Sequence, residues 1–205
     1  MNTRVNNSRH RIPAKSLCNI PGLFTEEMIR DGWILRNEII WHKPSCIPTP
    51  AKDRFTVDYE KIFFFVKSQK YDFTQQFEPY AESTFNRYKY SMSNSGKSAI
   101  FRHISGQPTG MMQTDPRGRN MRCVWRVPIE PSHEFHFAMY PTRLVKTPIE
   151  AGCSKGGIVL DPFMGSGSTA VMAQRLGRNF IGFEPNPEYI EIAKRRLAKE
   201  ITREK

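Results

Sequence analysis

The run from residue 156 to residue 201 constrains the fold more than any other part of the sequence, because it predicts four elements in a fixed order. A strand, GGIVLD (156–161), is followed by a helix, STAVMAQRLG (168–177), and by a second strand, NFIGFE (179–184). NPEYIEIAKRRLAKEI (186–201) then predicts an amphipathic helix with Lys194, Arg195 and Lys199 off its apolar face. Two strands linked by a helix form a parallel crossover, so the segment predicts an α/β unit of the nucleotide-binding type.

The turn between the first strand and the first helix has the spacing Gly165-x-Gly167-x-x-Ala170, which satisfies the loose dinucleotide-binding pattern. Glu184 ends the second strand about 20 residues further on, where a carboxylate accepts hydrogen bonds from ribose hydroxyls. Asp161 argues against a dinucleotide, because a carboxylate at the strand end repels a pyrophosphate bound at the helix N-terminus.

Asp161 attracts an ammonium group instead, and S-adenosylmethionine carries an ammonium, an adenosine and no phosphate. The turn therefore favours S-adenosylmethionine as the cofactor. Two alternatives stay open. Asp161 can do no more than cap the turn backbone, and a nicotinamide-dependent oxidoreductase is compatible with the glycine spacing alone.

The chain carries a net charge of +11, from 31 Lys and Arg against 20 Asp and Glu among 205 residues. This excess favours a polyanionic partner, first of all nucleic acid; a basic surface that only aids solubility is the alternative. Charged residues make up 25% and hydrophobic residues 39%, which excludes a disordered chain. The length predicts one globular core, alone or with a small module.

The first third of the chain predicts a second group of α/β elements. A short helix is expected at 25–33 and strands at 34–43 and 59–68, the latter apolar enough to be buried on both faces. A proline-rich loop joins the two strands, and a helix that begins at a proline is expected at 141–153. Together these elements predict a layered α/β fold.

Residues 76–132 lack aliphatic periodicity and are rich in Ser, Gly, Asn, Arg and Lys, so we expect an irregular insert with a few short strands. Its cations alternate with aromatic residues, a mixture that suits phosphate contacts and base stacking. For any single residue, a solvated surface position is the alternative. The candidate DNA contacts, in the insert and in the preceding loop, are Lys43, Arg54, Arg87, Lys89, Lys97, Arg102, Arg117 and Arg119.

The four cysteines are scattered without a C-x-x-C pair, and the N-terminal MNTRVNNSRHR is polar and basic. We therefore expect no export signal, free thiols and a reducing cytoplasm, and no apolar run approaches the length of a membrane span. SNSGKS (93–98) resembles the end of a phosphate loop, but Ser91 stands where the first glycine is needed. HEFH (133–136) has no matching Cys or His cluster, so no metal is expected.

Several segments together resemble one family. DPFMGSGSTA and RNFIGFEPNPEYIEIAKRRL resemble the cofactor motif of the DNA amino-methyltransferases and the segment that follows it. FHFAMYPTRLVKTPI resembles the family's other cofactor-contacting motif, which precedes the Asp-Pro-Phe strand in the permuted, β-type order. GWILRNEIIWHKPSCIPTPAKDRFTVDYEKIFFFVKS resembles the strands between the catalytic motif and the target-recognition region. The resemblance covers about residues 15–75 and 133–200.

The resemblance implies a Rossmann-like S-adenosylmethionine methyltransferase sheet with an irregular basic insert. Its domains would be a partial catalytic-side core at 1–75, a target-recognition insert at 76–132 and the cofactor-binding half of the core at 133–205. Glu184 would hold the ribose, and Ser168 stands where the family has threonine but keeps the hydroxyl. The implied cofactor contacts are His136, Phe137, Ala138, Asp161, Pro162, Phe163, Gly165, Ser166, Gly167, Ser168, Thr169 and Glu184.

The family's catalytic motif has no counterpart in the sequence. That motif is an Asp, Asn or Ser followed by Pro-Pro and an aromatic residue, which together hold the target amino group and stack on the extruded base. No Pro-Pro pair occurs here. In the β-type order the motif would lie N-terminal to residue 1, together with a strand and a helix of the core. We therefore expect an N-terminally incomplete chain, truncated or split, and name no catalytic residue.

The sequence thus predicts part of a site-specific enzyme that transfers a methyl group from S-adenosylmethionine to an amino group of double-stranded DNA. The target is cytosine N4, which we favour slightly, or adenine N6, and by resemblance the transfer needs neither a covalent enzyme intermediate nor a metal. The chain alone is expected to be inactive and to need an upstream polypeptide or a homodimer partner. The alternative is a non-catalytic DNA-binding remnant or subunit that retains the cofactor pocket.

Overall fold

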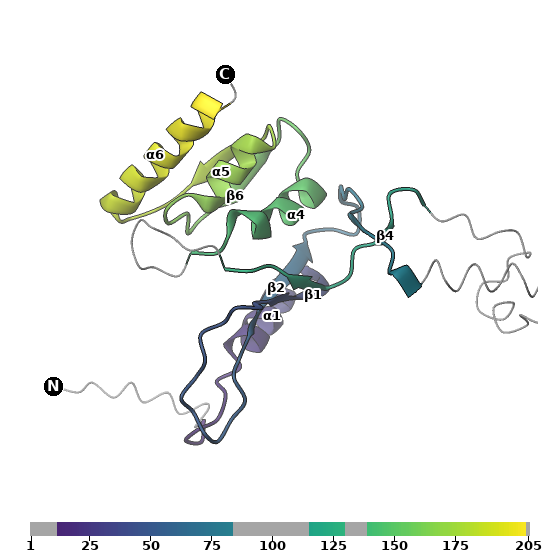
Figure 1. The fold of residues 1–205 in the computed structure, drawn as a ribbon, viewed down its shortest axis with the longest axis vertical. Coiled ribbons are helices and arrows are strands. Elements are labelled where there is room, and N and C mark those ends of the chain that lie inside the picture. Colours follow the sequence, from purple (N-terminus) through teal and green to yellow (C-terminus); the bar gives the residue numbers. More distant parts are fainter. Residues whose placement is uncertain (1–11, 84–114, 130–138, 204–205) are drawn as a thin grey trace, which may run out of the picture.

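The computed structural model describes residues 12–83, 115–129 and 139–203, and within these ranges the strands form three separate sheets (Figure 1). The elements are, in chain order, α1 (Ile20–Arg30), β1 (Ile34–His42), β2 (Tyr59–Val66), β3 (Phe77–Glu78), β4 (Arg119–Asn120), β5 (Val124–Arg126), α4 (Thr142–Gly152), β6 (Ile158–Asp161), α5 (Ser168–Arg175), β7 (Asn179–Gly182) and α6 (Pro187–Arg203).

The first sheet has the order β2-β1-β5, with β1 antiparallel to β2 and parallel to β5. Its two long strands confirm the expected strands at 34–43 and 59–68, apart from their ends. The expectation that the second of these is buried on both faces is wrong, because Val66 is its one buried residue. The physical reason is thin cover: Phe24 of α1 touches the rings of Phe63 and Phe65, but α1 itself contains no buried residue.

The elements from β6 to α6, residues 158–203, form a second unit beside the first sheet. They confirm the predicted order of strand, helix, strand and helix. β6 pairs in parallel with β7, from Ile158 opposite Asn179 to Asp161 opposite Gly182, and α5 makes the crossover. α6 is amphipathic as expected, because Ala193 is buried while Lys194, Arg195 and Lys199 are exposed.

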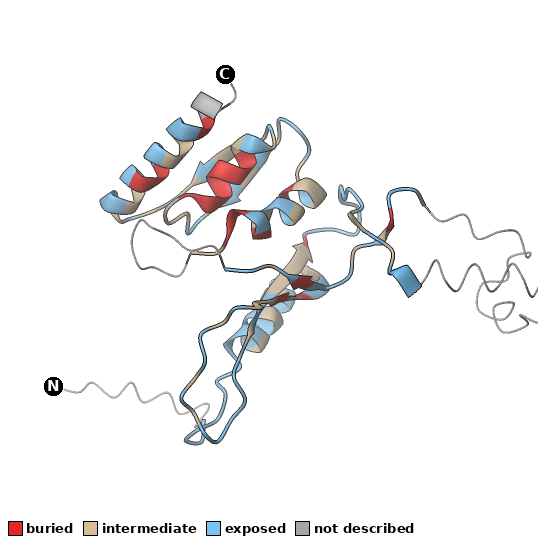
Figure 2. Cartoon of the chain, in the orientation of Figure 1, coloured by how far each residue is buried: buried red, intermediate tan, exposed pale blue. Residues whose placement is uncertain are grey.

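The two faces of the β6–β7 sheet differ in burial. Val159 and Phe180 point toward α5 and pack in its apolar cluster. The opposite face carries apolar side chains that are 47–62% exposed, namely Ile158, Leu160, Ile181 and Phe183. Figure 2 shows the contrast between the buried helix α5 and the exposed strand residues. Parallel sheets are usually covered on both faces, so this sheet lacks cover within the described residues.

Helix α4 joins the two units, because its buried side chains belong to different apolar clusters. Leu144 packs with Trp41 and Trp125 of the first sheet. Ile149, one and a half helical turns further on, packs with Ala173 of α5. A backbone hydrogen bond of 2.8 Å from Thr74 N–H to the Ala151 carbonyl adds a second connection. The helix expected at 141–153 therefore connects the first sheet with the unit formed by β6, α5, β7 and α6.

The described part of the insert forms a small arm. β3 and β4 pair antiparallel, and β5 leaves the arm to join the first sheet. Residues 84–114 of the insert, which include SNSGKS (93–98), and HEFH (133–136) lie outside the described residues. All four cysteines are free, as expected. No helix in the described ranges has both the length and the apolar character that crossing a membrane requires.

Candidate functional site

The candidate site is the turn between β6 and α5, residues 162–167. Gly165 and Gly167 have φ of 53° and 84°, the left-handed region that favours glycine. Gly167 also packs against α6, since a Cβ at this position would lie 2.9 Å from the Ala193 Cβ. The two glycines thus allow a sharp turn that lies directly on a neighbouring helix.

Asp161, at the end of β6, is bonded through both carboxylate oxygens. Its Oδ1 accepts a 3.0 Å hydrogen bond from Phe163 N–H, so Asp161 does cap the turn backbone. Its Oδ2 accepts a 3.1 Å bond from the Tyr140 hydroxyl, which also lies 2.6 Å from the Thr169 hydroxyl. Each oxygen keeps further acceptor capacity, because a carboxylate can accept about four hydrogen bonds.

Tyr140 is therefore a member of the site. Burial is the main cause that raises the pKa of its phenol, and the negative charge of Asp161 adds to the effect, while the hydrogen bond with Thr169 acts against it. A phenol with a raised pKa stays protonated at neutral pH and remains a donor to Asp161. This bond ties the segment before α4 to the end of β6.

Glu184 follows β7 and holds the turn from the other side. Its Oε2 accepts a 2.9 Å bond from Gly165 N–H, and its Oε1 accepts a 2.9 Å bond from Asn186 N–H. The structure therefore places two carboxylates, Asp161 and Glu184, around one glycine turn, as the sequence predicts from their positions at the ends of successive parallel strands.

The N–H groups of the turn are largely bonded within the protein. Phe163 N–H binds Asp161, Gly165 N–H binds Glu184, and Gly167 N–H donates 2.9 Å to the Met164 carbonyl. Met164 N–H in turn donates 3.0 Å to the Phe183 carbonyl. A phosphate bound at such a turn needs free N–H donors, so this arrangement is unsuited to a phosphate and suited to a cationic group.

Arg196 of α6 contacts the same turn from a third side. Its Nη1 donates 2.8 Å to the Ser166 carbonyl and 2.9 Å to the Ser166 hydroxyl, and lies 3.4 Å from the Ser168 hydroxyl. Arg196 and Tyr140 were not among the residues that the sequence predicts. Helical spacing carried a signal for Arg196, because it lies three residues after the buried Ala193 and therefore on the apolar side of α6.

The remaining predicted cofactor residues are placed as follows. Ser168 and Thr169 are buried in the first turn of α5, and Pro162 and Phe163 are exposed, with Phe163 at 87%. His136, Phe137 and Ala138 lie outside the described residues, as do the candidate DNA contacts Arg87, Lys89, Lys97 and Arg102. Among the residues that are described, no group of His, Cys, Asp and Glu side chains is arranged to hold a metal ion.

Two candidate DNA contacts lie near the first sheet. Trp41 is 4% exposed and donates 2.8 Å to the Val127 carbonyl, so it belongs to the core. The Lys43 ammonium lies 4.5 Å from the centroid of the Trp41 ring and pairs with Glu60. Arg54 is exposed in the loop between β1 and β2, where the described residues give it no ion-pair partner.

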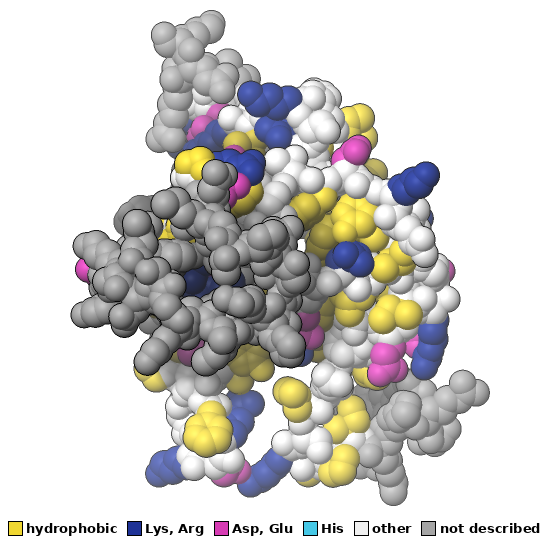
Figure 3. Space-filling view, turned by 90° about the vertical axis from the view of Figure 1, so that its right-hand side faces the viewer, with side chains coloured by type: hydrophobic (Ala, Val, Ile, Leu, Met, Phe, Trp, Pro, Cys, Tyr) yellow, Lys and Arg dark blue, Asp and Glu magenta, His cyan; other side chains and the backbone are white. Residues whose placement is uncertain are grey.

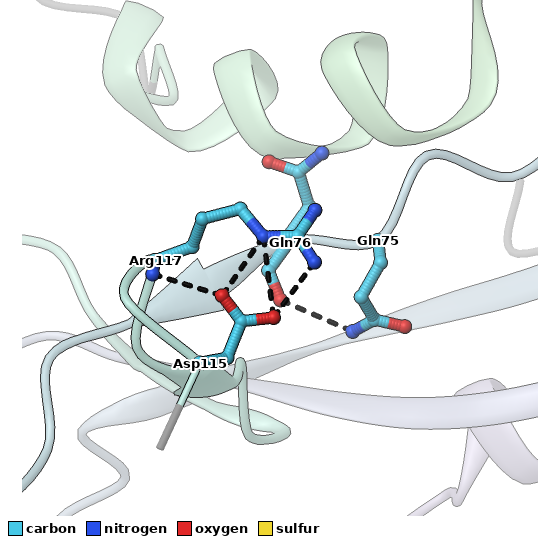
Figure 4. Close-up of polar contacts among 4 residues, drawn as sticks. All are labelled: Gln75, Gln76, Asp115 and Arg117. Carbon is cyan, nitrogen blue, oxygen red and sulfur yellow. Dashed lines mark hydrogen bonds and ion pairs between the residues drawn. The ribbon is translucent and has the colours of Figure 1, made fainter. Parts of the chain in front are cut away.

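The other two described candidates form ion pairs within the insert arm. Arg117 binds Asp115 at 2.7 Å and stacks on Phe77, and Arg119 binds Glu78 at 2.8 Å. Figure 4 shows the bonds between Arg117 and Asp115 beside Gln75 and Gln76. On the face drawn in Figure 3, the visible Lys and Arg side chains are spread around the surface rather than gathered in one patch.

Comparison with known proteins identifies similar sequences over almost the whole chain. The N6/N4 methyltransferase family model, described as DNA methylase, matches residues 4–195. Type II methyltransferase M.Cfr9I of Citrobacter freundii is 35% identical over 189 residues, which are 92% of this chain and 52% of that protein. Type II methyltransferase M.SmaI of Serratia marcescens is 33% identical over 187 residues, 90% of this chain and 53% of that protein. The chain thus spans about half the length of these curated relatives.

Solved structures share the fold. The PvuII DNA methyltransferase (cytosine-N4-specific) matches 94% of this chain and 63% of its own, with a TM-score of 0.59 and 20% identity. The M1.HpyAVI–SAM complex matches 89% of this chain and 71% of its own, with a TM-score of 0.58 and 22% identity. At these identities the likeness establishes a common α/β fold.

Proposed function

Because the chain belongs to the N6/N4 DNA methylase family, we propose that it is the cofactor-binding part of an enzyme that transfers a methyl group from S-adenosylmethionine to DNA. The acceptor is an exocyclic amino group, cytosine N4 or adenine N6. The observation that carries this proposal is the glycine turn after β6, which has the carboxylates of Asp161 and Glu184 around it and most of its own N–H groups already bonded.

The residues of the turn fit S-adenosylmethionine better than a dinucleotide. The ligand's ammonium would bind the remaining acceptor sites of Asp161, and its ribose hydroxyls would donate to Glu184. A pyrophosphate would meet two negative charges and few free donors. When bound, S-adenosylmethionine supplies a methyl group on a positively charged sulfur. The exposed ring of Phe163 gives that end of the ligand an apolar neighbour.

The catalytic motif, we propose, comes from polypeptide outside these 205 residues. The sequence contains no Pro-Pro pair, and the curated relatives are about twice as long as the segment matched. The bare apolar face of the β6–β7 sheet, with Leu160 61% and Phe183 60% exposed, supports the same proposal. Burial of apolar surface stabilises an association by about 25 cal/mol per Å² buried. The missing segment would therefore cover this face and complete the enzyme.

DNA is the proposed macromolecular partner. The net charge of +11 would give salt-sensitive affinity for the phosphate backbone. Arg54 supports a contact outside the insert, because it is exposed next to Phe55, which is 95% exposed. A cation beside an exposed aromatic ring suits phosphate and base contacts together. For Arg117 and Arg119, DNA would have to compete with Asp115 and Glu78.

Calorimetric titration tests the cofactor assignment. We expect the chain to bind S-adenosylmethionine and not NAD, and Asp161→Ala to weaken binding roughly tenfold to a hundredfold, as for the loss of a charge-assisted hydrogen bond. Asp72→Ala is the matched control, since Asp72 is exposed and far along the chain from the site. Binding of NAD with no binding of S-adenosylmethionine would overturn the assignment.

A methyl-transfer assay tests the missing half. Labelled S-adenosylmethionine and DNA are incubated with the chain alone, and with the chain plus a polypeptide that contains the part of M.Cfr9I this chain does not match. Activity only in the mixture supports the proposal. Activity of the chain alone refutes the need for an outside motif. If neither sample is active while cofactor and DNA still bind, the alternative of a non-catalytic DNA-binding subunit is favoured by the absent Pro-Pro motif.

A further inference from the structure

In the part of the chain that the structure describes, Arg196 is the one Lys or Arg side chain that contacts the glycine turn. We propose that Arg196 is a positioning residue, which holds the turn between β6 and α5 in the shape that binds S-adenosylmethionine. The inference rests on the proposed function for the identity of the ligand. It goes beyond that function by assigning a role to helix α6, which supplies no predicted cofactor contact.

The contacts of Arg196 converge on the middle of the turn. One guanidinium nitrogen, Nη1, binds both the carbonyl and the hydroxyl of Ser166, at 2.8 and 2.9 Å. Nη1 and Nη2 each lie 3.4 Å from the Ser168 hydroxyl at the start of α5. Arg196 therefore bonds the backbone of the turn itself, and it does so between the two glycines.

Three anchors then fix the turn at three successive points. Asp161 holds Phe163 N–H, Glu184 holds Gly165 N–H, and Arg196 holds the Ser166 carbonyl. The first two anchors are the acids proposed to bind the ligand. The third anchor is a donor, whereas the first two are acceptors, because the group it holds is a carbonyl. A positively charged donor binds a carbonyl more strongly than a neutral donor does.

The path of the backbone explains why α6 provides this donor. Gly167 allows α6 to approach, since any side chain there would meet Ala193 at 2.9 Å. Arg196 lies about one helical turn after Ala193 and therefore projects from the same side of α6. The close contact at Ala193 sets the distance between helix and turn, and Arg196 uses that distance to reach Ser166.

The shape of the turn affects binding of S-adenosylmethionine through the position of Glu184. The Glu184 carboxylate that would bind the ribose is oriented by two backbone donors, Gly165 N–H and Asn186 N–H. The Ser166 carbonyl shares its peptide plane with Gly167 N–H, and the Met164 carbonyl that this N–H binds shares its peptide plane with Gly165 N–H. Rotation of the Ser166 peptide therefore breaks a bond that helps to hold Gly165 N–H in place. Loss of Arg196 therefore displaces a proposed ligand contact without removing it.

The test compares Arg196→Met with Arg196→Lys and with Arg195→Met. Arg195 is the matched control, because it is the preceding residue of the same helix and is exposed. We expect Arg196→Met to weaken binding of S-adenosylmethionine roughly tenfold or more and Arg195→Met to leave it unchanged. Arg196→Lys should restore part of the affinity, since one ammonium can replace the bond to the Ser166 carbonyl but not the full set.

Hydrogen exchange of the chain without ligand gives a second readout. Arg196→Met should speed exchange of the amides of residues 163–168 and leave those of β7 unchanged, whereas a loss of general stability would raise exchange throughout the unit. Equal affinities of the wild-type chain and Arg196→Met, with equal exchange at the turn, would overturn the inference. If the wild-type chain binds no S-adenosylmethionine, the proposed function fails, and the exchange experiment still decides whether Arg196 positions the turn.

Discussion

The turn at Gly167 and the turn at Gly118 both hold a glycine in the left-handed region, with φ of 84° and 111°, and both lie among charged side chains. Around Gly167 those side chains come from distant parts of the chain, with Asp161 after one strand, Glu184 after the next and Arg196 from α6. Around Gly118 the pair is local, because Asp115 and Arg117 are two residues apart.

The difference shows what distinguishes the proposed binding site from a turn that is only stabilised by its own charges. Asp115 and Arg117 satisfy each other, and their side chains are partly or largely exposed, so their charges are screened by water. Asp161 and Glu184 are bonded to backbone N–H groups, which satisfies them without cancelling their charge. A ligand can therefore bind Asp161 and Glu184 directly, whereas at the Gly118 turn it would have to compete with the bond between Asp115 and Arg117.

The largest expected effect comes from adding a methyl group to each glycine. Gly167→Ala should lower the free energy of unfolding by about 2–4 kcal/mol, because it combines a left-handed backbone with a clash against Ala193. A Cβ in Gly118→Ala would clash with the Glu78 carbonyl, but the substitution should cost less, since the small arm can open locally. Urea denaturation of both variants measures the difference. An equal loss for the two variants would show that the arm is as integral to the fold as the site.

The next effect concerns the hydrogen bonds at each turn. Tyr140→Phe should destabilise the protein by about 1 kcal/mol, because Thr169 is buried and loses its partner together with Asp161. Arg117→Met should shift the unfolding midpoint less than Tyr140→Phe does, since an exposed ion pair is screened by water and contributes little. Thermal unfolding of the two variants and the wild-type chain checks this. A larger shift for Arg117→Met than for Tyr140→Phe contradicts the comparison.

The order of the elements was the part of this fold that the sequence specified best. Apolar periodicity, with Gly177 at the end of the helix expected at 168–177, predicts the strand, glycine turn, helix and strand of the second unit. The positions of Asp161 and Glu184 follow from the ends of β6 and β7 and need no tertiary information. These features are local or depend only on strand pairing.

The features that the sequence did not predict depend on tertiary contacts. Tyr140 and Arg196 reach the site from segments 21 or more residues away. Helical spacing places Arg196 on the apolar side of α6, but it does not indicate which turn the side chain meets. The half-exposed β2 was missed for a related reason, because an apolar strand predicts burial but not which element will cover it. Helix propensity also gave no indication that α4 joins two apolar clusters.

Alkaline titration should separate the two turns further. A folded-state pKa of Tyr140 above that of the unfolded chain means that folding favours the protonated phenol. Its contribution to stability is thus complete below the ordinary tyrosine pKa, about 10, and is lost as the pH rises through the folded value. Absorbance at 295 nm should show a late-ionising tyrosine in the wild-type chain that is missing from the titration of Tyr140→Phe. Identical curves after scaling for the missing residue would contradict the raised pKa.

The smallest effect is expected at acid pH, at the Gly118 turn. The hydrogen bonds from the Arg117 side chain and backbone lower the pKa of Asp115 to about 2. Since the folded pKa lies below the unfolded one, the interaction is present above the ordinary aspartate range and is lost as the pH falls toward 2. A carboxyl NMR titration should give a midpoint near 2 that rises in Arg117→Met, and a wild-type midpoint near 4 would contradict it. Because the pair is local, its protonation should leave the amides of residues 163–168 unchanged.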